Sequence, residues 1–445
     1  MKLEMNKLSR VCLGVCILIS LNSSVVLADD WPMFMGNPQR TGQVDVPTPA
    51  KISAMKLSWQ YAFNASVSAT PIATGNQLLV AAENGNLYAF DWTLKKLQWI
   101  YHTEGGIAST PVAVDGVVYF LSRDGYFYAV TLADAQLVWR YKTQGERKFS
   151  ALGGYDLPLS KGATVDAWDF YLSSPLIHQG TVYFGSSDEH VYALDIKTGM
   201  PKWVFKGDES FHASPSYSDD KIYIGSMGTR LYALNAETGE KAWDFQGGAE
   251  RRYSVMLGFI AAATVDDNQV YIGGRDANFY AFNKTDGKLQ WQYDAKGSWV
   301  MATAAVDDEN VYVATSDTGL LLAINKKTGK EKYRFNTRVW TYTSPVVVAN
   351  KYIFVGTMTG ELYGVDKQSG KQLWYYQTPE RKADLMGIVD KKSGKLIDDK
   401  LFTKGRQLQA GVEYVKELGA FLASPIWIDN QLIAITANGK MLVFK

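Results

Sequence analysis

A repeat of about 40 residues runs through almost the whole of this 445-residue chain. Its clearest marker is a Ser-Pro or Thr-Pro pair: Pro71 and Pro111 are 40 residues apart, and so are Pro175 and Pro215. A tryptophan follows each of these prolines by 28 residues, at Trp99, Trp139, Trp203 and Trp243. A period of this length predicts one supersecondary unit that recurs around a shared core.

Each unit has the pattern of four short strands. In the unit that begins at Ser174, an apolar run precedes the alternating stretch 182–185, and a turn separates this stretch from 191–195. The sequence Lys197-Thr198-Gly199 then marks a tight hairpin, where glycine supplies the positive φ that such turns require. Four antiparallel strands in about 40 residues are typical of a propeller blade.

Seven complete units begin near residues 69, 109, 173, 213, 262, 303 and 343, and an eighth begins at Ala423 but has room for only three strands. The missing strand is predicted at 56–63, because Trp59 lies 40 residues before Trp99. We therefore predict an all-β, eight-bladed β-propeller of four-stranded antiparallel blades, closed by the N-terminal strand. The aromatic residues at the repeated position are expected to dock neighbouring blades: Trp59, Trp99, Trp139, Trp203, Trp243, Trp291, Tyr333 and Trp374.

The N-terminus has the pattern of a secretory signal. Lys2, Lys7 and Arg10 precede an apolar run from 11 to 21, and Ala28 provides a small residue for cleavage. We expect a signal peptide at 1–28 that is cleaved after Ala28, an N-terminal extension at 29–55, and a single propeller domain at 56–445. This organisation predicts export to the periplasm or cell envelope, with no transmembrane span in the mature chain.

Cysteine and charge exclude several classes of function. The two cysteines, Cys12 and Cys16, both lie in the predicted signal, and Val15 disfavours lipid attachment at Cys16. The mature chain therefore has no disulfide, thiolate nucleophile or cysteine-based metal site. A formal net charge of +1 argues against a nucleic-acid partner. We expect a monomeric propeller.

No catalytic or metal-binding motif stands out. The histidines His102, His178, His190 and His212 have no zinc-helix spacing, and each falls at a different point of its repeat unit. A Ser/His/Asp arrangement stays possible in any chain, but no nucleophile elbow is visible. The sequence therefore predicts no catalytic residue and no metal site.

Three insertions interrupt the repeat, at 144–172, 247–261 and 379–421. Each follows the outer strand of one blade and precedes the inner strand of the next, so all three are expected on one face of the disc. Long loops on a rigid scaffold commonly carry binding sites. The candidate ligand or partner residues on this face are Arg123, Trp168, Asp169, Arg251, Arg275, Trp299 and Trp340. The alternative is that Trp168 and Trp299 plug the channel, while the arginines pair with acids such as Asp124, Asp169 and Asp276.

The repeat resembles the pyrroloquinoline-quinone-type β-propeller family. The resemblance rests on Ser-Pro, Tyr-Ala-Leu-Asp, Thr-Gly and Trp, as in the segment from Ser174 to Trp203. The segment from Trp31 to Gly42 also resembles the start of exported members. The family contains quinoprotein dehydrogenases and non-catalytic scaffolds, one of which is the propeller lipoprotein of the outer-membrane β-barrel assembly machinery. The resemblance therefore implies the fold without deciding the activity.

Three functions follow from this comparison. The leading hypothesis is an exported, non-catalytic scaffold that binds a protein or envelope component, with no cofactor. The second is an oxidoreductase of the alcohol or sugar dehydrogenase type that uses pyrroloquinoline quinone with calcium. The vicinal disulfide typical of those enzymes is absent, and their calcium ligands have no matching positions. The third is a carbohydrate- or peptide-binding module.

Overall fold

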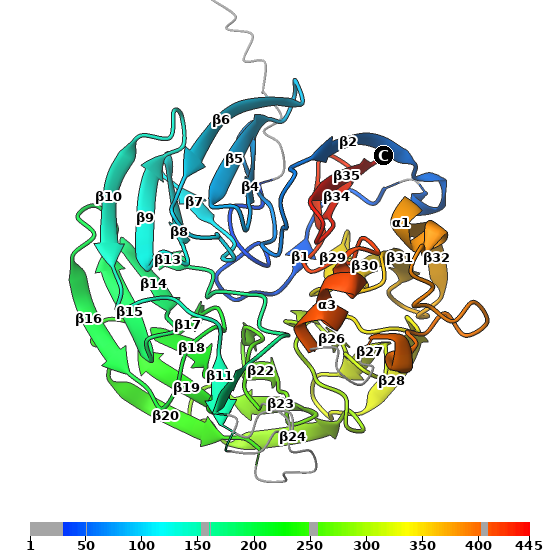
Figure 1. Cartoon of the computed structure of the whole chain (residues 1–445). Helices are drawn as coiled ribbons and strands as arrows, with labels where there is room; N and C mark the ends of the chain where they lie inside the picture. The colour runs from blue at the N-terminus through cyan, green and yellow to red at the C-terminus, as the bar shows by residue number, and fades with distance from the viewer. Residues whose placement is uncertain (1–29, 50, 153–159, 161, 249–256, 402–407) are drawn as a thin grey trace, which may run out of the picture.

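The chain forms a ring of eight β-sheets around a central channel (Figure 1). This computed structural model describes residues 30–49, 51–152, 160, 162–248, 257–401 and 408–445. The predicted signal peptide and its cleavage after Ala28 lie outside the described residues.

The first four blades occupy the sequence up to residue 246 in order. Blade 1 contains β3 (Ile72–Thr74), β4 (Gln77–Ala81), β5 (Asn86–Asp91) and β6 (Lys96–His102). Blade 2 contains β7 (Val112–Val114), β8 (Val117–Leu121), β9 (Tyr126–Thr131) and β10 (Leu137–Lys142). Blade 3 contains β13 (Leu176–His178), β14 (Thr181–Gly185), β15 (His190–Asp195) and β16 (Pro201–Lys206). Blade 4 contains β17 (Ser216–Ser218), β18 (Lys221–Gly225), β19 (Arg230–Asn235) and β20 (Lys241–Gln246).

The remaining blades complete the ring. Blade 5 contains β21 (Thr264–Val265), β22 (Gln269–Gly273), β23 (Asn278–Asn283) and β24 (Leu289–Asp294). Blade 6 contains β25 (Ala305–Val306), β26 (Asn310–Ala314), β27 (Leu320–Asn325) and β28 (Glu331–Asn336). Blade 7 contains β29 (Val346–Val348), β30 (Tyr352–Gly356), β31 (Glu361–Asp366) and β32 (Gln372–Gln377). Blade 8 contains β33 (Ile426–Ile428), β34 (Gln431–Ile435), β35 (Lys440–Phe444) and the N-terminal strand β2 (Leu57–Ala62).

The last blade closes the ring with strands from both ends of the propeller. Strand β2 pairs antiparallel with β35, and Trp59 lies opposite Val443. The predicted eight-bladed architecture and its closure by the N-terminal strand are therefore confirmed. Hydrogen bonds between the two terminal strands hold the circle shut, so that no blade is left with three strands.

The repeated aromatic residue and the repeated turn glycine meet across five of the eight blade boundaries, where Gly199, Gly239, Gly287, Gly329 and Gly370 lie against a ring of the preceding blade. The Trp139 indole of blade 2 donates to the Ile196 carbonyl of blade 3 at 2.9 Å. A Cβ on Gly199, in that same turn, would lie 2.6 Å from the Trp139 ring, and Gly199 has φ +70°. Glycine is required there by conformation and by space. The other boundary bonds are donated by Trp99, Trp203, Trp243, Trp291, Tyr333 and Trp374, whereas Trp59 packs on Phe90.

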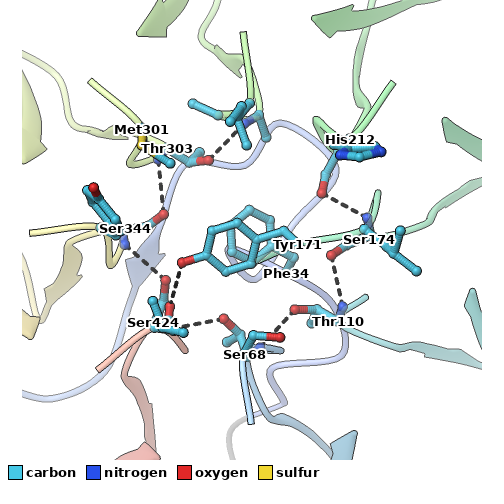
Figure 2. Close-up of a pocket in the computed structure, with 18 of the residues that line it drawn as sticks. Phe34, Ser68, Thr110, Tyr171, Ser174, His212, Met301, Thr303, Ser344 and Ser424 are labelled. Atoms are coloured by element: carbon cyan, nitrogen blue, oxygen red, sulfur yellow. Dashed lines mark hydrogen bonds between the residues drawn. The ribbon is translucent and has the colours of Figure 1, made fainter. Parts of the chain in front are cut away.

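The Ser-Pro and Thr-Pro pairs mark a ring of hydrogen bonds around the channel (Figure 2). The hydroxyl before each of these prolines, and that of Thr303 before Ala304, accepts the backbone N–H of the equivalent residue in the preceding blade. Seven such bonds, at 2.9–3.1 Å, are donated by Thr70, Thr110, Ser174, Ala262, Thr303, Ser344 and Ser424. The Ser424 N–H donates to the Thr70 hydroxyl, which links blade 8 to blade 1. Blade 5 has Ala262 at this position, so it offers no hydroxyl to the Ser214 N–H.

The N-terminal extension crosses the inner strands beyond this ring. It contains β1 (Gln43–Val44), which pairs parallel with β29, and the 3-10 helix η1 (Ile52–Ala54). Its carbonyl groups accept N–H bonds from several inner strands, including one from Ala113 to Pro32. The Arg40 guanidinium, fully buried, donates to the carbonyls of Phe34, Ser174, Pro175 and Pro215. Burial lowers the pKa of Arg40 to about 9.

The three insertions lie on the opposite face. They carry the hairpin of β11 (Ser150–Leu152) and β12 (Ala163–Val165), and the helices α1 (Pro379–Ala383), α2 (Asp398–Leu401) and α3 (Leu408–Lys416). Side chains from all three insertions share one hydrophobic cluster with Trp299 and Tyr342. We call the surface formed by the described parts of the insertions, which are 144–152, 162–172, 257–261, 379–401 and 408–421, the insertion face. In the part of the chain that the structure describes, no helix has the length and hydropathy of a membrane span.

Candidate functional site

The central channel is filled from both sides. Phe34 enters from the N-terminal extension and Tyr171 from the first insertion, and both lie at the centre of the hydroxyl ring (Figure 2). The Tyr171 hydroxyl donates to the Leu422 carbonyl at 3.1 Å, and burial raises the pKa of this phenol. The cavity that the described residues leave here measures about 40 Å³, which is room for a few water molecules.

This channel does not fit a tricyclic quinone. The cavity is far smaller than the roughly 300–1,000 Å³ of ordinary cofactor and ligand sites. Seven of the ring residues already use their hydroxyl as an acceptor between blades. No group of three or more His, Cys, Asp or Glu side chains suited to a metal ion occurs among the described residues. We therefore derive no step through a quinone or its calcium ion.

Aromatic side chains close the channel on the insertion face. Trp168 makes edge contacts with Trp340 at 5.1 Å and with Tyr342 at 6.0 Å between ring centroids. Phe170 and Met301 belong to the same hydrophobic cluster. These side chains come from the first insertion and from the short connections before blades 6 and 7. The cluster therefore joins separate blades over the channel.

Arg275 is buried beneath this cluster. Its guanidinium forms an ion pair with the Asp166 carboxylate, and both side chains have no exposed surface. It also donates to the Trp168 carbonyl at 3.4 Å and lies 4.7 Å from the Trp299 ring centroid. This arrangement holds the first insertion to the turn between β22 and β23. Because water is excluded, breaking this ion pair by removing either charge would be strongly destabilising.

The predicted face residues are brought together, but at different depths. Trp168, Asp169, Arg275 and Trp299 are buried, whereas Arg123 and Trp340 are half-buried. Arg251 lies outside the described residues. Two of the acids that meet the arginines differ from those considered above: Arg275 pairs with Asp166, and the Arg123 Nε lies 3.5 Å from the Glu83 carboxylate.

Sequence reasoning missed a buried polar chain that contains Asp169. Its carboxylate lies 2.8 Å from His212 Nδ1, and His212 Nε2 lies 2.8 Å from the Ser187 hydroxyl. Ser187 in turn contacts the Glu146 carboxylate at 2.9 Å. Asp169 and His212 are 43 positions apart in the sequence, so only the folded arrangement of the blades brings them together.

This Asp-His-Ser geometry lacks what a nucleophile needs. Asp169 and Ser187 have no exposed surface, and His212 is 1% exposed. The Ser187 hydroxyl is also shared with Glu146 and with the Arg147 carbonyl. A catalytic serine must reach a substrate carbonyl, which this enclosure prevents. The chain instead fastens the first insertion to blades 3 and 4.

The electrostatics of Asp169 agree with a structural role. Burial alone would raise the pKa of this carboxyl, but the neighbouring His212 and the Phe149 N–H lower it below its usual value. The hydrogen bond from the Phe149 N–H measures 2.7 Å. The ionised form of Asp169 is therefore the one that the fold favours.

The exposed part of the insertion face includes an apolar tip. Leu385 is 94% exposed and Met386 is 38% exposed, directly after helix α1. Nearby, Ile388 and Val389 are buried in the cluster that covers the channel. The tip is therefore held on an ordered base while its side chains face solvent.

Comparison with known proteins agrees with this architecture. Solved structures similar to this chain include a BamB crystal structure from Moraxella catarrhalis, with a TM-score of 0.61 and 17% identity over 88% of this chain and 98% of that one. A europium-containing methanol dehydrogenase gives 0.66 and 14%, over 94% and 98%. The quinohemoprotein alcohol dehydrogenase from Comamonas testosteroni gives 0.67 and 13%, over 94% and 80%. At these identities the likeness shows the fold alone.

The family follows from sequence. The profile described as outer membrane protein assembly factor BamB matches residues 43–167, 163–274, 208–302 and 275–402. The chain belongs to this family, and the resemblance inferred from the repeat is confirmed. A search of curated proteins gives no significant match.

Proposed function

We propose that this protein is an exported, non-catalytic β-propeller scaffold whose insertion face binds a protein or another envelope component. The observation that carries the proposal is the filled channel: Phe34 and Tyr171 occupy the axis and leave only about 40 Å³. The elaborated surface is the insertion face, which presents the apolar tip at Leu385. Membership of the BamB family supports a protein partner.

The oxidoreductase alternative is supported by the likeness in fold to two dehydrogenases. It requires Tyr171 to leave the channel, which would break its bond to Leu422 and open the Trp168 cluster. Titration of the purified mature chain with pyrroloquinoline quinone and calcium tests this alternative. Saturable visible absorption with alcohol-dependent dye reduction would favour the enzyme and overturn the scaffold.

The scaffold itself is tested by capture from envelope extracts of the source cells. The immobilised mature chain is compared with Leu385→Asp, which places a charge on the apolar tip without touching the core. Thr285→Asp is the matched control, because Thr285 is exposed in a turn on the opposite face. We expect a discrete envelope partner that Leu385→Asp loses and Thr285→Asp retains. Equal capture by all three proteins would contradict the assignment of the face.

A further inference from the structure

A cleft of about 250 Å³ opens on the insertion face beside the plugged channel. Its walls come from four parts of the chain: the connection into blade 1, the turns of blades 1, 2 and 8, the first insertion, and helix α3 with the segment that follows it. The lining contains three cations, Arg123, Lys148 and Lys416. It is smaller than the roughly 300–1,000 Å³ typical of drug-sized ligands, so it suits a small group.

The acidic side chains of the cleft already have partners. Glu83 accepts the Ser68 hydroxyl at 2.8 Å and lies 3.5 Å from Arg123. Asp169 is held by His212 at 2.8 Å, as described above. The third, Glu413, lies on helix α3 and accepts from Lys416 at 3.0 Å.

Among the described residues, two of the three cations in the cleft, Lys148 and Arg123, have donor groups without an acceptor. Among the described residues, Lys148 has neither an ion pair nor a hydrogen bond through its ammonium group. Arg123 uses Nη2 on the Phe170 carbonyl at 3.3 Å, but its buried Nη1 has no acceptor there. Burial, reinforced by the charges of Arg123 and Lys416, lowers the pKa of Lys148. A half-buried ammonium without a counterion and a guanidinium nitrogen without an acceptor are the complement of an anion.

The walls indicate which anion. Val67, Phe170, Leu422 and Ala437 line the same cleft and are apolar. One ammonium is unmatched, so a single negative charge balances it, whereas a phosphate dianion would add charge beside Glu83 and Asp169. A carboxylate that carries a small apolar group satisfies both features.

We propose that this cleft binds a monocarboxylate with a small apolar side group, held by Lys148 with the support of Arg123. The carboxylate comes either from a free organic acid or from the C-terminal residue of a peptide, because both present the same chemistry. The inference goes beyond the scaffold function, since the cleft is defined without reference to a protein partner.

Calorimetric titration of the mature protein with N-acetylleucine tests the site. N-acetylleucinamide, which has the same shape without the charge, is the matched ligand. We expect saturable binding of the acid below about 10 mM and at least about tenfold weaker binding of the amide. Saturation by inorganic phosphate alone, or equal affinity for acid and amide, would overturn the proposal.

Variants separate this site from general effects of folding. Lys148→Gln should weaken binding of N-acetylleucine at least about tenfold, whereas Lys148→Arg should retain it. Lys142→Gln removes an exposed lysine on β10 and is the control, with unchanged binding expected. Unchanged affinity in a folded Lys148→Gln would refute the role of the ammonium.

The source of the carboxylate is decided with a longer probe. Binding of acetyl-Gly-Gly-Leu with a free C-terminus as tightly as N-acetylleucine assigns the site to a chain terminus. Binding of N-acetylleucine alone assigns it to a free acid. If the protein binds N-acetylleucine but captures no envelope partner, only the scaffold function is refuted. If it captures a partner but does not bind N-acetylleucine, only the carboxylate site in the cleft is refuted.

Discussion

Gly239→Ala tests how the blades are fastened. Gly239 has φ +75°, and a Cβ there would lie 2.6 Å from the indole of Trp203 in the preceding blade. Gly116 is the matched control, because its φ is +76° and nothing lies within 4 Å of its Cβ position. Both substitutions impose the same backbone strain, of about 1–2 kcal/mol. Only Gly239→Ala also displaces an aromatic ring.

The additional cost follows from what Trp203 contributes at the boundary. Its Nε1 donates to the Ala236 carbonyl at 2.9 Å, and its ring contacts Tyr183. Full truncation of a buried tryptophan costs about 3–5 kcal/mol, and Trp203 is only half-buried, so displacement should cost about 2 kcal/mol. We expect Gly239→Ala to lower the free energy of unfolding by about 3–4 kcal/mol, against about 1–2 kcal/mol for Gly116→Ala.

A double-mutant cycle, measured by denaturant titration with fluorescence and circular dichroism, isolates the contact. In a Trp203→Ala background, Gly239→Ala should cost no more than the backbone strain, about 1–2 kcal/mol. The two changes should therefore be non-additive by about 2 kcal/mol. Additivity within about 0.5 kcal/mol would refute the idea that the turn glycine makes room for the tryptophan.

The hydroxyl ring, the buried ion pair and Asp169 each give a further expectation. Ala262→Ser should supply the missing acceptor for the Ser214 N–H and raise the free energy of unfolding by about 0.5–1.5 kcal/mol. Ser174→Ala should lower the free energy of unfolding by about 1–3 kcal/mol. Denaturant titration that shows no gain for Ala262→Ser would contradict a stabilising role for the hydroxyl ring. Arg275→Ala should cost about 3–5 kcal/mol by breaking the buried ion pair with Asp166, and a melting temperature like that of the wild type would show a surface role instead. Because the pKa of Asp169 is lowered in the folded state, this carboxyl binds a proton more readily in the unfolded chain. The stability that Asp169 contributes is therefore present above about pH 4 and is lost as the pH falls further. Asp169→Asn should reduce the fall in melting temperature with acidification in melts recorded between about pH 2 and 6. An unchanged fall would show that Asp169 does not contribute to it.

The features of the fold that recur in each blade could be predicted from the sequence. Each blade presents the same residues at the same step, so the strand order, the closure through Trp59 and the boundary aromatic residues follow from a period of about 40 residues. The common face of the insertions follows from the alternation of strand direction. The functions of the Ser-Pro and Thr-Gly pairs were visible only in the structure, because each acts on a different blade from its own.

The candidate site was less predictable because its contacts do not repeat. Arg275 lies in the turn between β22 and β23, and its partners come from other parts of the chain: Asp166 and Trp168 of the first insertion, and Trp299. The same insertion places Tyr171 on the axis and Asp169 beside His212. The N-terminal extension carries Arg40 to carbonyls of blades 3 and 4, which no local pattern indicates. One signal was available: the aromatic residues on this face gave the alternative prediction that Trp168 and Trp299 plug the channel.

Site-specific photo-crosslinking in living source cells tests the central claim most directly. A photoreactive phenylalanine derivative replaces Leu385 on the insertion face or Thr285 on the opposite face, and mass spectrometry identifies the adducts. The account predicts one discrete envelope protein crosslinked from position 385 and none from position 285. Absence of any adduct at 385, or the same adducts from both positions, would contradict a scaffold that acts through its insertion face.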